Sequence, residues 1–147
     1  MTDKDKEEKS SDKLTRDYGT VIRESAVLTS FAGFLFGFLL TISISSSGSF
    51  IFTDKVILLI ALSSMTVSIS LFIMPIIYHH LEYPYIDLEK FKKRSHRFTI
   101  YGIIPAIITL FLGLKLAMTS LLGNNIGAFL LGIVPFVLVY IIYRSRK

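Results

Sequence analysis

Four long apolar blocks, separated by short polar or charged segments, constrain this chain more than any other feature. The blocks cover residues 25–45, 56–78, 98–120 and 126–143. A bilayer core about 30 Å thick takes about 20 helical residues, so the first three blocks cross it easily and the fourth crosses it at the short end. The blocks lack period-two alternation, and four strands are too few to close a membrane barrel. The sequence therefore predicts an all-α membrane protein, a bundle of four transmembrane helices.

The composition agrees with one membrane domain and excludes several chemistries. Of 147 residues, 52% are hydrophobic and only 18% are charged, against about 25% charged in soluble domains. There is no Cys, which excludes disulfides, thiolate metal sites and a Cys nucleophile.

The segments outside the blocks are charged. We expect residues 1–24 to form an N-terminal tail, disordered to about residue 12 because it has too little apolar surface to offset chain entropy. Residues 25–143 form the four-helix domain, and residues 144–147 form a basic C-terminus. Acidic residues mixed among the basic ones before the first block argue against a secretory signal.

Lys and Arg predict the orientation. Of the 16 basic residues, the N-terminal segment has six, the loop between the second and third blocks has five and the C-terminus has three. The positive-inside rule places these three segments, and therefore both termini, in the cytoplasm. There the basic residues face anionic lipid headgroups, so the charge does not require nucleic acid as a partner.

Each block carries small residues spaced for close helix packing, the main source of helix association in lipid. The set is Gly33 and Gly37; Ser64 and Ser68; Gly102 with Ala106 and Gly113 with Ala117; and Ala128 with Gly132. Two interpretations stay open for Gly33 and Gly37: they seal one bundle, or they form a contact between copies of the chain.

Prolines and one lysine interrupt the blocks. Pro75, Pro105 and Pro135 predict kinks, either as simple bends or as hinges. No Asp or Glu falls inside a block, which argues against a proton-coupled carrier. Lys115 lies near the outer end of the third block, where it snorkels to the headgroups, lines a pore mouth or contacts a neighbouring helix.

Histidines gather at the cytoplasmic side. The candidates for a metal site or a pH-sensitive contact are His79, His80, Glu82 and His96. Their spacing matches no metal-binding motif. We therefore expect a solvated cluster with no metal and no cofactor.

Three stretches resemble a family of uncharacterised four-span prokaryotic membrane proteins, a domain of unknown function. They are AGFLFGFLLTI at residues 32–42, LFIMPIIYHHLEY at 71–83 and KKRSHRFTIYG at 92–102. Phe36, Phe38 and Leu39 with the following Leu-Thr match the family's first motif. Pro75 and His79 match its second motif, with His80 where the family has Arg. The resemblance implies a membrane location and four spans, and implies no activity.

A second, fainter pattern is similar to the Orai calcium channels. Residues 23–34 resemble the segment that enters their pore helix, and residues 58–64 resemble their second helix. Orai channels need an acidic residue to select calcium, whereas the corresponding position here falls near Phe38, which does not coordinate calcium.

These observations lead to a structural or accessory membrane protein that self-associates or binds another membrane protein. The alternative is an oligomeric ion channel or small-solute permease, with Phe38 and Lys115 at its pore or interface. No Ser–His–Asp set or phosphate loop is present, so we expect no enzyme. We expect the protein in a cell membrane, the plasma membrane of a prokaryote.

Overall fold

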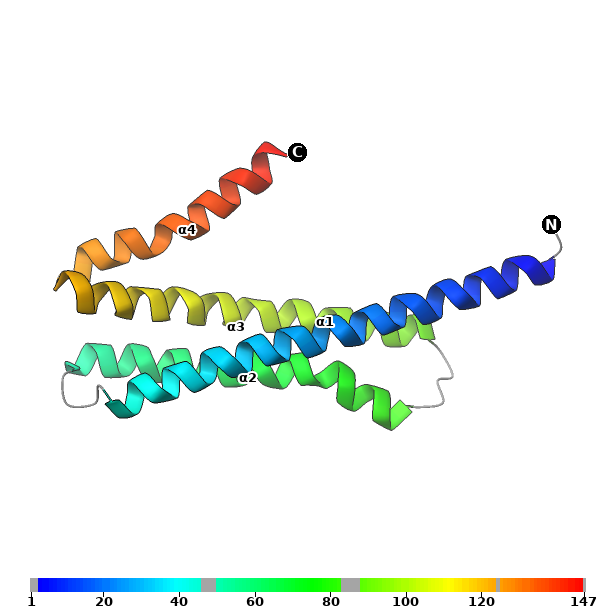
Figure 1. Cartoon of the computed structure of the whole chain (residues 1–147), viewed down its shortest axis with the longest axis horizontal. Helices are drawn as coiled ribbons and strands as arrows, with labels where there is room; N and C mark the ends of the chain where they lie inside the picture. Colours follow the sequence, from blue (N-terminus) through cyan, green and yellow to red (C-terminus); the bar gives the residue numbers. More distant parts are fainter. Residues whose placement is uncertain (1–2, 46–49, 83–87, 124, 147) are drawn as a thin grey trace. The chain divides into compact units, whose positions relative to one another are not determined.

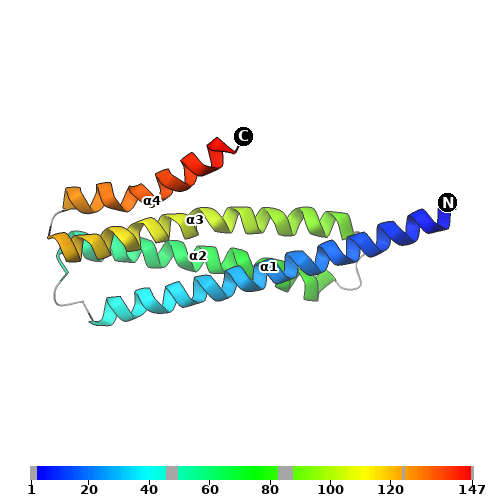
Figure 2. The same cartoon turned by 45° about the horizontal axis from the view of Figure 1, so that its top comes forward.

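The computed structural model describes residues 3–45, 50–82, 88–123 and 125–146. Four helices account for almost all of them: α1 (Asp3–Ser45), α2 (Phe52–Glu82), α3 (Leu88–Leu122) and α4 (Asn125–Ser145) (Figures 1 and 2). The described residues contain no strand. Each helix has a segment long and apolar enough to cross a membrane. The predicted all-α fold with four spans is confirmed.

The helices are longer than the apolar blocks. α1 begins at Asp3, whereas residues up to about 12 were expected to be disordered. Lys and Glu are good helix formers, so a charged tract joined to a long helix extends it without needing a buried face. α3 ends where Gly123 adopts φ 64°, and the Gly123 amide donates to the Thr119 carbonyl at 2.9 Å, a common glycine cap.

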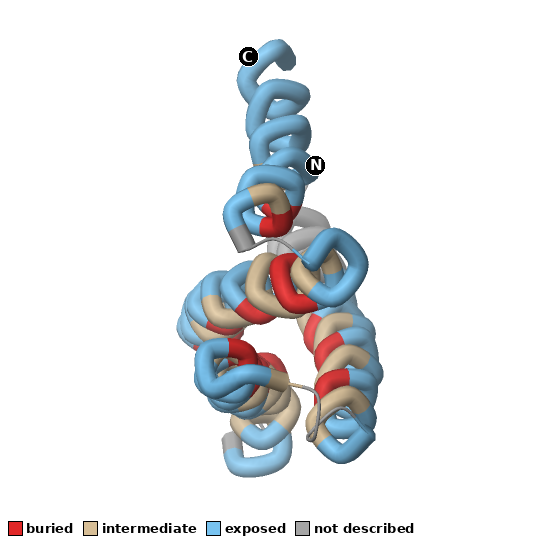
Figure 3. The backbone as a smooth tube through the Cα atoms, turned by 90° about the vertical axis from the view of Figure 1, so that its left-hand side faces the viewer, coloured by how far each residue is buried: buried red, intermediate tan, exposed pale blue. Residues whose placement is uncertain are grey.

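Buried positions repeat with a seven-residue period along three of the helices, and Figure 3 shows them in red. On α1 they are Ser25, Ala32 and Leu39. On α2 they are Asp54, Leu58, Ala61, Met65, Ser68, Phe72 and Pro75. On α3, Ser95, Gly102, Thr109 and Leu116 form one such row. On α2 the steps between buried residues are four and three in turn, an average of 3.5 residues. This spacing is typical of left-handed helix packing.

The chain forms two compact units, each built from parts of the long helices. Unit 1 comprises Met1–Leu35 and Thr66–Pro105. Its buried side chains include two aromatic residues, Phe72 and Phe91, and also serines. Unit 1 therefore contains the first part of α1, the second part of α2 and the first part of α3.

Unit 2 comprises Phe36–Met65 and Ala106–Lys147. Its core is a cluster of four buried side chains: Leu39, Leu58, Ala61 and Leu116. α4 adds only two buried residues to this unit, Ala128 and Gly132, and residues 137–146 are all exposed. In a membrane protein, such an exposed apolar surface faces lipid or a partner helix.

Candidate functional site

In unit 1, α2 and α3 pack closely at Gly102 of α3. A Cβ added to Gly102 would lie 2.6 Å from Cε1 of Phe72 and 3.3 Å from Cβ of Leu71. The hydroxyl of Ser68, one turn before Phe72 on α2, donates to the Gly102 carbonyl at 2.6 Å. Because Gly102 has no side chain, the two backbones approach closely enough for this interhelical hydrogen bond to form.

In unit 2 the hydroxyl of Thr109 plays the corresponding role. It donates to the Ala61 carbonyl at 3.1 Å and is buried. The residue lies on α3 and its acceptor on α2, so this bond sets the register of the two antiparallel helices.

The other small residues differ in how closely they are packed. A Cβ on Gly132 of α4 would lie 3.6 Å from the Phe111 ring and 3.8 Å from the Lys115 backbone, while one on Gly113 would lie 3.9 Å from Leu39. Phe111 also meets Phe129 and Phe136 edge-on, with ring centroids 5.6 and 6.0 Å apart. Ala128 is fully buried. Ser64 and Ala106 are half-buried, and Ala117 is exposed.

Gly33 and Gly37 of α1 lie in open space. A Cβ added to either would meet nothing within 4 Å. Other small exposed residues extend the same face of the helix at spacings of three and four. We call Ala26, Ser30, Gly33, Gly37 and Thr41 the small-residue stripe of α1. The hydroxyls of Ser30 and Thr41 donate to carbonyls four residues earlier, at 2.9 and 3.0 Å, so neither raises the polarity of the stripe much.

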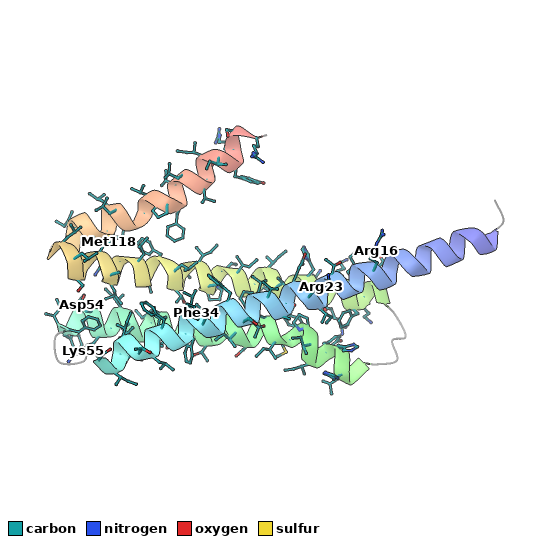
Figure 4. The ribbon with its side chains drawn as sticks, viewed as in Figure 1. Arg16, Arg23, Phe34, Asp54, Lys55 and Met118 are labelled. Atoms are coloured by element: carbon teal, nitrogen blue, oxygen red, sulfur yellow. The ribbon has the colours of Figure 1, made fainter. Side chains whose placement is uncertain are left out.

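An acid and a base are buried at the end of unit 2 where α2 begins. Asp54, expected outside the second block, lies inside α2 because this helix begins at Phe52. Asp54 and Lys115 are each 8% exposed. The Thr109–Ala61 bond gives the register of the two antiparallel helices. Seven residues before Ala61 is Asp54, and seven residues after Thr109 is Leu116, so Asp54 lies level with Leu116, the residue that follows Lys115 in the sequence. Figure 4 places Asp54 and Met118 at this same end.

One oxygen of Asp54 stays unsatisfied. Its Oδ1 atom is buried and has no hydrogen-bond partner among the described residues. A carboxylate is costly to bury in a low dielectric unless a positive charge is close. Sequence reasoning missed this residue because Asp54 precedes the continuous apolar run. The only signal was its place in the first turn of a helix, where an acid is favourable.

The prolines lie inside their helices. Pro75 is fully buried in α2, Pro105 is half-buried in α3 and Pro135 is exposed in α4. Figure 1 shows bends in the C-terminal part of α2 and along α4. A proline removes one helical hydrogen bond and clashes with the preceding turn, which accounts for such bends.

The histidines do not meet as the metal hypothesis requires. The rings of His79 and His80 lie 5.1 Å apart at the end of α2, while His96 lines a groove against α1. Within the described part of the chain, no three His, Asp or Glu side chains are placed to hold a metal ion. The side chain of Glu82 lies outside the described residues.

Aromatic and basic side chains contact one another in unit 1, where α2 ends and α3 begins. Arg94 donates to the Tyr78 hydroxyl, and its guanidinium also lies 5.5 Å from the centre of the Tyr78 ring. Tyr78 in turn stacks on the buried Phe91, with ring centroids 6.0 Å apart. These contacts join the end of α2 to the beginning of α3, and combine a cation–π interaction with a hydrogen bond.

Buried hydroxyls without partners are also found in unit 1. The described residues provide no hydrogen bond for the hydroxyls of Ser25, Thr29 and Ser95, and both serines are fully buried. The sequence offers no signal that separates these hydroxyls from the many others in the spans.

Four helices of this length and hydropathy fit an α-helical multi-pass membrane protein. The model of a family of unknown function, DUF6328, matches residues 7–145. The chain belongs to this family, as the expected resemblance to an unknown-function membrane family implied. No curated protein and no solved structure matches the chain, and no comparison supports the similarity to Orai.

Proposed function

We propose that this protein is a self-associating accessory protein of a cell membrane, with both termini in the cytoplasm. The observation that carries the proposal is the open face of α1, where a Cβ on Gly33 or Gly37 would meet nothing within 4 Å. Glycines that pack inside a protomer have close neighbours, as Gly102 does. Open glycines four residues apart allow a second helix to approach the α1 backbone closely.

The sides of the stripe support the same proposal. Phe34 is 75% exposed and Phe38 is 59% exposed, so bulky side chains stand beside the small-residue stripe. Small residues flanked by large ones suit two helices that pack against each other across the stripe. Among the described residues, no observation favours the alternative of a channel or permease.

The test is a double substitution in the stripe. Gly33→Leu with Gly37→Leu puts two bulky side chains into the small-residue stripe of α1. We expect this change to raise the dissociation constant for self-association at least about tenfold, which corresponds to about 1.4 kcal/mol. The measurement is the oligomeric mass in native nanodiscs, together with crosslinking in membranes over a range of protein-to-lipid ratios.

Two further variants control for general effects. Phe31→Leu changes an exposed position of α1 outside the stripe and should leave assembly unchanged. Gly132→Leu should lower stability through the contact of α4 with Phe111, because that glycine has neighbours within its own unit. Unchanged assembly in the Gly33/Gly37 double variant would refute the proposed interface, and a chain that is monomeric in every nanodisc would refute self-association itself.

A further inference from the structure

A groove lies between α1 and α3 in unit 1. Its volume is about 530 Å³, within the range of small-molecule sites. Its lining consists of Thr20, Arg23, Glu24, Val27, Leu28, His96, Thr99, Ile100 and Ile103. These residues come from two helical segments that run in the same direction, since α1 and α3 each run opposite to α2 (Figure 1).

The lining changes from polar to apolar along both helices. On α1 the first residues are Thr20, Arg23 and Glu24, and the next turn has only aliphatic side chains. On α3 the order is the same, with His96 and Thr99 before Ile100 and Ile103. One ligand in this groove must therefore have a polar end and an apolar end.

The position along the membrane normal fits a lipid. The apolar span of α1 covers 27 residues from Gly19, about 40 Å of helix against a hydrocarbon core of about 30 Å. Its charged first turns therefore lie at headgroup depth, and the aliphatic part of the groove lies at the depth of the acyl chains.

The charges of the polar end are of both signs. Arg23 offers a guanidinium suited to a phosphate, and His96 adds ring N–H groups. The hydroxyls of Thr20 and Thr99 donate to the carbonyls of Arg16 and Ser95, at 3.1 and 3.2 Å, so they only accept hydrogen bonds from a ligand. Glu24 adds a carboxylate beside them. Within the described residues, Arg23, Glu24 and His96 form no ion pair with one another, so both signs are available to a ligand. Figure 4 labels Arg23 on α1.

We propose that this groove binds a zwitterionic phospholipid with a primary amine in its headgroup, a phosphatidylethanolamine. Arg23 binds the phosphate, and Glu24 accepts hydrogen bonds from the ammonium group. One acyl chain lies along Val27, Leu28 and the two isoleucines. A choline headgroup has no N–H to donate, and a glycerol headgroup has no positive charge for Glu24, so this site distinguishes the three headgroups.

The experiment is native mass spectrometry of the full chain, released from detergent and titrated with phosphatidylethanolamine, phosphatidylcholine and phosphatidylglycerol of identical chains. We expect the first lipid to bind at least about fivefold more tightly than the other two. Arg23→Gln should weaken the binding of both the ethanolamine and the choline lipid about tenfold. Lys93→Gln removes an exposed positive charge near the beginning of α3, outside the groove, and should leave the binding of both lipids unchanged.

The second variant tests the headgroup contact. Glu24→Gln should bring the affinities for the ethanolamine and choline lipids within about twofold of each other, while Glu89→Gln, a matched loss of an exposed acid, keeps the preference. Glycerophosphoethanolamine, the headgroup without chains, should not displace the lipid. The proposal fails if phosphatidylglycerol binds most tightly, if Arg23→Gln behaves like Lys93→Gln, or if the soluble headgroup competes, which would indicate a water-soluble phosphoamine ligand.

Discussion

Gly102→Leu is expected to abolish the accumulation of folded protein, because no side chain fits between α3 and Phe72. Even a methyl group at Gly102 would lie 2.6 Å from the Phe72 ring. Phe72 is only 2% exposed, and a close-packed interior leaves its ring little room to move. The same substitution would also separate the backbones joined by the Ser68–Gly102 hydrogen bond.

The smaller variant Gly102→Ala gives this prediction a measurable size. Overpacking of this kind costs about 1–3 kcal/mol, and the better helix propensity of Ala over Gly offsets about 1 kcal/mol of this cost, so we expect a net loss of up to about 2 kcal/mol. The measurement is the free energy of unfolding in mixed micelles, titrated with a denaturing detergent.

Two comparisons separate the contact from a general effect of the substitution. Gly33→Ala adds the same methyl group in open space and should leave stability unchanged or raise it. Phe72→Leu shortens the opposing side chain, so Gly102→Ala should cost less in that background than in the native chain. If Gly102→Ala is as stable as Gly33→Ala, the close approach of α2 and α3 at this point is wrong.

Asp54→Leu is expected to destabilise the protein strongly, although it replaces a polar group by an apolar one inside an apolar helix. Asp54 and Lys115 are both buried in unit 2 and lie at one level of α2 and α3. We predict that these two opposite charges attract each other, because the attraction between charges is strong in a low dielectric. Removing one partner of a buried pair typically costs about 3–5 kcal/mol, because the other charge stays buried.

A double-mutant cycle measures this coupling. Lys115→Leu should cost a similar amount, and Asp54→Leu with Lys115→Leu should recover most of the loss, since an apolar replacement of both partners is often neutral. Lys55→Leu is the matched control, because Lys55 is the exposed neighbour of Asp54 and its loss should have little effect. Losses that add without recovery would show that the two charges act independently.

Hydropathy was sufficient to predict the number and type of spans in this chain. The free energy of transferring a helix into lipid depends on the summed apolar surface of its residues, which can be calculated from the sequence alone. It was less informative about the ends of the helices. α1 begins at Asp3 and α2 begins at Phe52, because a helix continues through polar residues as long as its backbone hydrogen bonds are made. This extension is what brings Asp54 into the buried row of α2.

The sequence by itself determined that this chain forms four apolar helices, and it supplied small residues on each of them. Only the tertiary structure decided which of those residues make contacts: Gly102 lies against Phe72, whereas Gly33 and Gly37 face open space. The physical reason is that lipid is as apolar as the packed interior, so apolar character does not reveal which face of a membrane helix is buried. Helix rotation and register set that face, and here both depend on contacts between segments far apart in the chain, such as Ser68 with Gly102 and Thr109 with Ala61.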